Sequence, residues 1–136
     1  MNEVVFDKEK YQSFIDENNG TGTLKVQAFV ANQAFPLQGI DVKVFKNIGD
    51  DKVIFFEGET DSSGIIDDIS LPAVVSKEEV EQASDIIYTI YNIEAINPET
   101  KEKKEYEIAV FSDLKIIQSI RFSNNYLMGE ELWIME

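Results

Sequence analysis

The fold class is decided by the stretch GTLKVQAFV, residues 22–30, in which apolar side chains recur at every second position. Leu24 and Val26 share one face, and Lys25 and Gln27 share the other. Such alternation is typical of a β-strand that is buried on one side only. We therefore expect a sheet to begin here, with one face packed into a core and the other turned to solvent.

The segments that follow repeat this pattern between turn residues. Val42 and Val44 alternate with Asp41 and Lys43. The cluster TDSSG at residues 60–64 indicates a turn, because Asp and Ser bond nearby backbone amides and Gly tolerates a positive φ. The expected strands cover residues 22–30, 40–45, 53–56, 65–71, 86–96, 106–111, 114–122 and 131–135.

Two short helices are also predicted. Residues 7–19 carry apolar side chains at helical spacing and are followed by Gly20, a residue that often ends helices. Residues 76–83 begin with Ser76 and Glu79, which form a capping box. We expect the first helix to pack on the sheets and the second to interrupt the series of strands.

The number of strands predicts an all-β fold: a Greek-key antiparallel β-sandwich of about seven or eight strands with a short N-terminal helix and one short helical insertion. The chain has 136 residues and 43% hydrophobic content, enough for one core of this size. We expect residues 1–20 to be an N-terminal helix or linker and residues 21–136 to be a single sandwich domain.

Composition restricts the function. The chain has no cysteine and no histidine, which excludes disulfides, thiolate chemistry and zinc sites built from these residues. Its net charge of −14 argues against nucleic acid and anionic membrane surfaces as partners. No signal peptide and no membrane-spanning segment is visible, so the compartment stays open between cytoplasm and envelope. We expect a monomer or a weak oligomer that needs no cofactor.

The turn motifs carry a resemblance to a known group of folds. The segments are GTLKV at 22–26, FPLQGIDVKV at 35–44, ETDSSG at 59–64, ISLP at 69–72 and YTIY at 88–91. Their order resembles carboxypeptidase regulatory-like, prealbumin-like (transthyretin-like) modules and the related collagen-adhesin B-type repeats. The likeness covers residues 22–122. It implies a structural or adhesive sandwich, in a version found in bacterial envelope proteins and sometimes beside peptidoglycan-binding modules.

The resemblance brings two chemistries into consideration. One transthyretin-like branch hydrolyses 5-hydroxyisourate with histidines, an arginine and a C-terminal Tyr-Arg-Gly-Ser motif; this chain has no histidine and a single arginine, which argues against that activity. Collagen-adhesin repeats can join a Lys to an Asn beside an acid. The candidates here are Lys25, with Glu94 and Asn124 or Asn125, but the alternation places Lys25 on the solvent face as an ordinary charged lysine.

Acidic residues provide a weak candidate for a cation site. Asp61, Asp67 and Asp68 lie around one predicted turn, and carboxylates are the ligands that calcium prefers. No calcium-loop spacing is present, and acids beside sandwich turns usually cap backbone amides. We therefore predict no metal site.

Aromatic residues are the candidates for a binding surface. Phe29 and Phe45 fall on the polar faces of their strands, and Trp133 shares a face of the last predicted strand with Met135. Tyr126 lies nearby in the sequence. Exposed aromatic side chains bury large areas on a partner, although a terminal segment can equally cover them.

These observations predict that the chain is not an enzyme. The first hypothesis is a structural or protein-interaction module of a bacterial cell-envelope or surface assembly, with contacts at strand edges, turns and uncovered aromatics. The second is a carbohydrate- or peptidoglycan-binding module that uses Trp133, Tyr126 or Phe45. The third is an acidic regulator that binds a basic partner.

Overall fold

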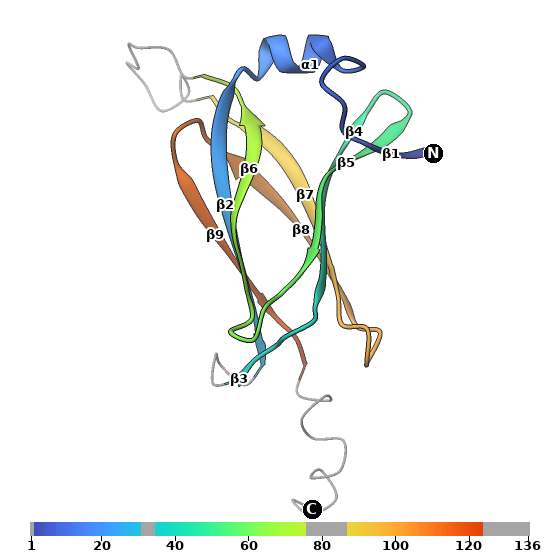
Figure 1. Ribbon diagram of the computed structural model, residues 1–136, viewed down its shortest axis with the longest axis vertical. Helices are drawn as coiled ribbons and strands as arrows, with labels where there is room; N and C mark the ends of the chain where they lie inside the picture. The colour runs from blue at the N-terminus through green and yellow to red at the C-terminus, as the bar shows by residue number, and fades with distance from the viewer. Residues whose placement is uncertain (1, 31–34, 76–86, 124–136) are drawn as a thin grey trace, which may run out of the picture.

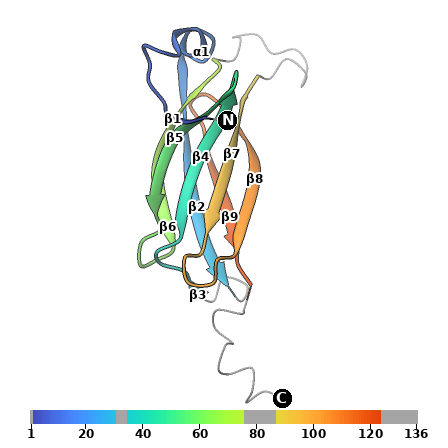
Figure 2. The ribbon, with the colours of Figure 1, turned by 90° about the vertical axis from the view of Figure 1, so that its right-hand side faces the viewer.

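The computed structural model describes residues 2–30, 35–75 and 87–123. These residues form nine strands and one helix, arranged as two sheets packed face to face (Figure 1). The predicted all-β sandwich is confirmed. Figure 2 shows the larger sheet from its face, with the strands running along the long axis of the molecule.

The larger sheet has five strands in the order β1-β5-β4-β7-β8. Neighbouring strands are antiparallel except β1 and β5, which run parallel. The bounds are β1 (Asn2–Val5), β5 (Asp51–Glu59), β4 (Asp41–Ile48), β7 (Thr89–Ile96) and β8 (Lys103–Val110).

The smaller sheet is built around β2 (Gly20–Val30), the strand with the period-two pattern. It pairs antiparallel with β6 (Ile65–Ala73) and with the two-residue β3 (Phe35–Pro36), and parallel with β9 (Lys115–Arg121). The alternation therefore predicts the strand itself but not its parallel partner, which lies more than 90 residues away in the chain.

The core lies between the two sheets and consists of the inward residues of both. Tyr91 on β7 is fully buried, and its hydroxyl donates a hydrogen bond to the carbonyl of Pro72 on β6, which ties one sheet to the other. Burial raises the pKa of the Tyr91 hydroxyl far above its ordinary value. The largest fully buried side chains besides Tyr91 are Phe122, Leu24, Ile40, Leu71, Ile93, Ile120, Val26, Val30, Val42, Val44 and Val53.

The turn at residues 60–64 forms as its sequence predicts. Thr60 is buried, and its hydroxyl donates to the carbonyl of Leu37 at 2.6 Å and accepts from the amide of Ile40 at 3.0 Å. Gly64 has φ +75° and lies so close to the carbonyl of Ala28 that a Cβ would be 2.5 Å from that oxygen. The turn is thus bonded to residues 37–40 through Thr60 and packed against β2 at Gly64.

The N-terminal segment differs from expectation. The helix α1 covers only Gln12–Glu17, because the chain leaves the helix at Asn18 and Gly20 is already the first residue of β2. The side-chain nitrogen of Asn18 donates to the backbone carbonyl of Phe14, and its side-chain oxygen accepts from the buried hydroxyl of Thr89. These bonds fix α1 across one end of the sandwich (Figure 1).

Strand β1 has no counterpart among the predicted elements, since four residues are too few to reveal a period. The predicted helix at 76–83 and the predicted strand at 131–135 lie outside the described residues. Among the residues that are described, no helix has the length and apolar character needed to cross a membrane.

Candidate functional site

Two of the three acidic candidates for a cation site, Asp61 and Asp67, are bound by protein groups. One carboxylate oxygen of Asp61 accepts from the amides of Ser63 and Ile65, and Asp67 pairs with the ammonium of Lys115 at 2.7 Å. The bond from Lys115 holds the pKa of Asp67 below its usual value. Asp68 adopts φ +56° at a bulge of β6. In the described ranges no three Asp or Glu side chains are placed to hold a metal ion.

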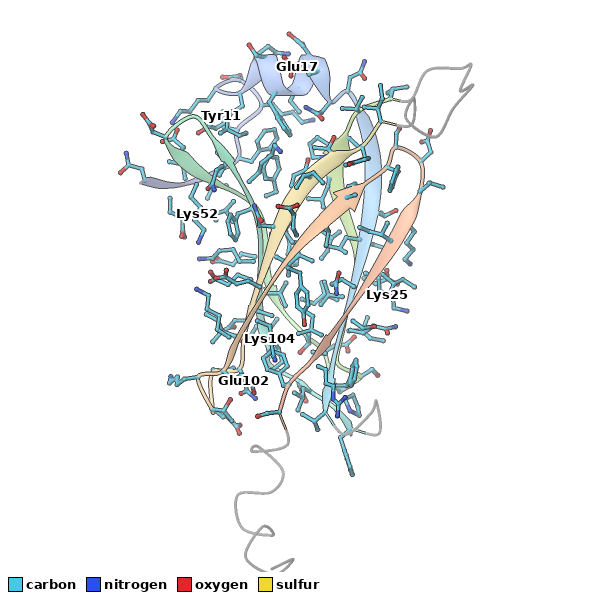
Figure 3. The ribbon with its side chains drawn as sticks, turned by 180° about the vertical axis from the view of Figure 1, so that it is seen from behind. Tyr11, Glu17, Lys25, Lys52, Glu102 and Lys104 are labelled. Atoms are coloured by element: carbon cyan, nitrogen blue, oxygen red, sulfur yellow. The ribbon has the colours of Figure 1, made fainter. Side chains whose placement is uncertain are left out.

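Lys25 and Glu94 are not brought together. Lys25 lies on the outer face of the smaller sheet, and Glu94 lies on the outer face of the larger sheet, where it pairs with Lys52 and Lys103. Figure 3 shows Lys25 and Lys52 on opposite sides of the sandwich. Asn124 and Asn125 lie outside the described residues. The described residues therefore contain no buried Lys–acid pair of the isopeptide kind.

The aromatic candidates are separated from one another. Phe45 lies on the outer face of the larger sheet beneath the ammonium of Lys52, which is 4.2 Å from the ring centroid. Phe29 lies half-buried on β2, beside a hollow of about 170 Å³ on the smaller sheet. Trp133 and Tyr126 fall outside the described residues, so the platform predicted from them stays a prediction.

Charged side chains on the outer face of the larger sheet neutralise one another across its five strands. Lys52 reaches both Glu3 on β1 and Glu94 on β7, and thereby joins opposite parts of the sheet. Pairs of this kind on a surface each contribute little to stability. Lys52, which takes part in two of them, also covers the ring of Phe45. The ion pairs are Glu3–Lys43, Glu3–Lys52, Glu94–Lys52, Glu94–Lys103 and Glu105–Lys103.

A largely apolar cleft lies beneath α1. It has a volume of about 380 Å³ and lies between the edges of β5 and β6, with Phe6, Phe55 and Leu71 in its walls. Phe6 stacks on Phe55 with ring centroids 4.5 Å apart, and Phe55 meets the edge of Tyr91 at 5.0 Å. The aromatic cluster thus closes the end of the sandwich and belongs to its core.

The free edge of β5 next to this cleft is the clearest candidate for a contact surface. Strand β1 pairs with β5 only as far as Ile54, and the amide of Phe6 then donates to the carbonyl of Ile54 at 2.8 Å. From Phe55 to Glu59, no described strand pairs with this side of β5. In Figure 1, β5 continues past the end of β1 toward β3. We call this five-residue edge the β5 slot.

Side chains make the β5 slot a shallow groove with apolar walls. The groove has a volume of about 310 Å³ where β1 ends. Phe55 and Phe56 are half-buried, and Val5 is 78% exposed. Exposed apolar side chains beside unpaired backbone N–H and C=O groups are typical of contact sites. The groove is lined by Glu3, Val4, Val5, Ile54, Phe55, Phe56 and Glu57.

The outer side of the β5 slot is acidic. Glu57 and Glu59 are exposed and lie beside Lys43 and Asp41 of β4 in a trough of about 390 Å³. Lys43 is held by Glu3, and its ion pair with Glu3, aided by Glu57 and Glu94, raises the pKa of Lys43. Among the described residues, neither Glu57 nor Glu59 has an ion-pair partner.

Two other edge strands, β6 and β8, carry protective features. Strand β6 is bent by the bulge at Asp67 and Asp68, and β8 carries Lys103 and Lys104. Bulges and lysines are devices that discourage strand addition. The β5 slot has acids and no lysine, and its one irregularity is the register shift at Phe55, its first residue. The sequence held one signal for it: Phe55 and Phe56 are adjacent apolar residues that break the period of two, and the register shifts there.

Comparison with known proteins gives the fold. No protein-family model matches the chain, and no curated protein matches it. A structure of 5-hydroxyisourate hydrolase from Klebsiella pneumoniae is similar with a TM-score of 0.52 and 15% identity, over 75% of this chain and 90% of that one. Transthyretin from Sparus aurata gives 0.44 and 15%, over 73% and 90%. The first of these similarities shows the fold, which is prealbumin-like.

One sequence prediction is corrected by this comparison. The chain was predicted not to be an enzyme, but its fold is shared with a hydrolase, so the exclusion of catalysis is wrong. The prediction failed because the absence of histidine and cysteine bears on particular chemistries and not on the fold as a scaffold. At 15% identity the likeness shows the fold alone and transfers no activity.

Proposed function

We propose that this chain is a structural or protein-interaction module that holds a partner protein at the β5 slot. The single observation that carries the proposal is the run from Phe55 to Glu59, a strand edge without a neighbouring strand among the described residues, with the exposed Val5 beside it. An unpaired edge offers backbone donors and acceptors to another chain, and Val5 offers apolar area.

The acidic trough supports a basic partner. Asp41, Glu57 and Glu59 have no ion-pair partner among the described residues, so a cationic surface would meet unpaired carboxylates at the rim of the slot. Rim charges of this kind raise the association rate and select partners by sign. This observation favours the acidic-regulator hypothesis as the mode in which the module binds.

The proposal also assigns the chain to a narrower family within the fold and to a cellular setting. We assign the chain to the carboxypeptidase regulatory-like and collagen-adhesin B-type group within the prealbumin-like fold, in a cell-envelope or surface assembly. The order of turn motifs supports this, above all the TDSSG turn that the structure closes around Gly64. The carbohydrate-binding alternative depends on Trp133 and Tyr126 and stays a prediction.

Site-directed photo-crosslinking tests the proposal. The chain has no cysteine, so Glu57→Cys creates one labelling site at the slot, and Glu107→Cys creates a matched site on the exposed face of β8. Each labelled protein is incubated with the envelope and soluble fractions of its source cells. We expect one discrete adduct from position 57 and none from position 107.

The adduct should disappear when unlabelled wild-type protein competes, and it should weaken in 1 M salt because the rim contacts are ionic. Equal labelling from both positions would mean that contact at β5 is nonspecific. Absence of an adduct at position 57 in both fractions would contradict the proposal.

A further inference from the structure

We propose that the partner segment enters the β5 slot as an added β-strand, in which basic side chains alternate with apolar ones. This inference rests on the proposed function and specifies the chemistry of its partner. It follows from three features of the slot: a free backbone edge, an apolar inner side and an acidic outer side.

The backbone of β5 sets the mode of binding. Its other side is used by β4, which pairs with β5 from Asp51 to Glu59 except at Phe55, where the register shifts. Its free side begins where β1 stops at Ile54 and ends at the turn that starts with Thr60. Five residues of strand span about 17 Å, which is the length of an ordinary short strand. An extended segment fits this edge, whereas a helix would leave the backbone groups unpaired.

The inner side of the edge selects apolar residues. Phe55 contacts Phe6, Phe14 and Tyr91, and it therefore points toward the core from the very edge of the sheet. Phe56 packs against the same core, and its ring lies so close to Gly58 that a Cβ there would be 2.7 Å from Cζ. A strand added beside β5 would place every second side chain over these half-buried rings.

The outer side selects basic residues. Glu57 is the cross-strand neighbour of Lys43, and Glu59 is that of Asp41, so both carboxylates point to the outer face of the sheet. Side chains of an added strand that face outward would lie beside them, within the distance at which cross-strand ion pairs form. Because successive side chains of a strand alternate between the two faces of a sheet, the added strand would carry basic and apolar residues in turn.

A second copy of this chain fits the slot poorly. Two copies of β5 placed edge to edge would bring Glu57 and Glu59 of one copy near the same carboxylates of the other. The chain as a whole carries a net charge of −14, which adds to the repulsion. A foreign basic segment removes this conflict.

The test uses a blocked synthetic peptide, Lys-Val-Lys-Val-Lys-Val-Lys, titrated into the isotope-labelled full chain. Two further probes are the same peptide with Glu in place of Lys and the same peptide with alternate backbone nitrogens methylated. We expect saturable amide shifts at residues 55–59 with the lysine peptide only. Methylation should abolish binding, because it removes the donors on which strand addition depends.

Charge reversal provides the matched variants. Glu57→Lys should weaken binding of the lysine peptide by about tenfold, since it replaces an attraction by a repulsion at the rim. Glu107→Lys makes the same change on β8 and should leave the affinity unchanged. The folded state of each variant is checked by its amide spectrum.

Each other result would overturn the inference. Equal binding of the methylated peptide would show ionic adhesion without strand addition, and equal weakening by both variants would show that only net charge matters. Binding of the glutamate peptide, or shifts centred on β8, would refute the assigned chemistry. A specific crosslink at position 57 with no peptide binding would leave the proposed function standing and reject the strand alone.

Discussion

Replacing Thr60 by Val should destabilise the protein by about 3 kcal/mol. The hydroxyl of Thr60 is buried and serves two backbone groups, the carbonyl of Leu37 at 2.6 Å and the amide of Ile40 at 3.0 Å. Valine has nearly the same shape but leaves both groups buried without a partner. Each unpaired group costs about 1–3 kcal/mol, and relaxation of the turn recovers part of the sum.

Urea unfolding followed by circular dichroism measures this change. Thr60→Ser keeps the hydroxyl and loses one methyl group, so it should cost only about 1 kcal/mol. Thr100→Val is the exposed control, because the hydroxyl of Thr100 accepts a single bond from the amide of Glu102 in an exposed turn. A Thr60→Val protein within about 0.5 kcal/mol of wild type, or one no less stable than Thr60→Ser, would refute the reasoning.

Three further predictions follow from single contacts. Burial raises the pKa of Tyr91 above its ordinary value of 10.0, so the stability tied to its neutral hydroxyl is complete below pH 10 and falls above that pH. Tyr91→Phe should reduce this alkaline loss of stability in urea titrations, and an unchanged loss would contradict the role of the Tyr91 hydroxyl. Gly64→Ala should lower the melting temperature more than Gly49→Ala, because both positions have positive φ but only at Gly64 would the new Cβ clash with a backbone oxygen. Equal shifts in melting temperature would exclude the steric cause. The bond from Lys115 lowers the pKa of Asp67 below its ordinary value of 3.8, so the stability from this pair is present above that pH and lost as pH falls below it. Asp67→Asn should change the urea midpoint of unfolding slightly at pH 7 in low salt and not at all in 1 M salt. A change that does not depend on salt would disprove an ionic origin.

The sequence predicts the strands of the sandwich well, because period-two burial is a local property. The alternation from Leu24 to Val30 is reproduced in β2, where inward residues are buried and outward residues are half-exposed. The TDSSG turn forms because Asp61 and Gly64 supply the required bonds and backbone angle within the turn itself. The helix over residues 7–19 is overestimated, since Asn18 bonds to Thr89, a partner far away in the chain.

The candidate site shows the opposite situation. Phe29 and Phe45 were named as candidates from their strand faces, but their sequence positions do not tell that they lie on different sheets, or that Lys52 covers Phe45. The β5 slot also depends on distant pairing, because the edge from Phe55 to Glu59 is open only where β1 stops at Ile54. Within β5 the adjacent Phe55 and Phe56 break the period of two, but this break does not tell which side of the strand will be left without a neighbour.

The sequence by itself determined the all-β class, most strand positions, the turn at residues 60–64 and the strongly acidic surface. Only the tertiary structure decided the parallel pairing of β2 with β9, the bond from Tyr91 to Pro72 and the free edge of β5. The physical reason is the range of the interactions. Burial periodicity and turn geometry act within a few residues, whereas strand order and open edges depend on which segments meet across the whole chain.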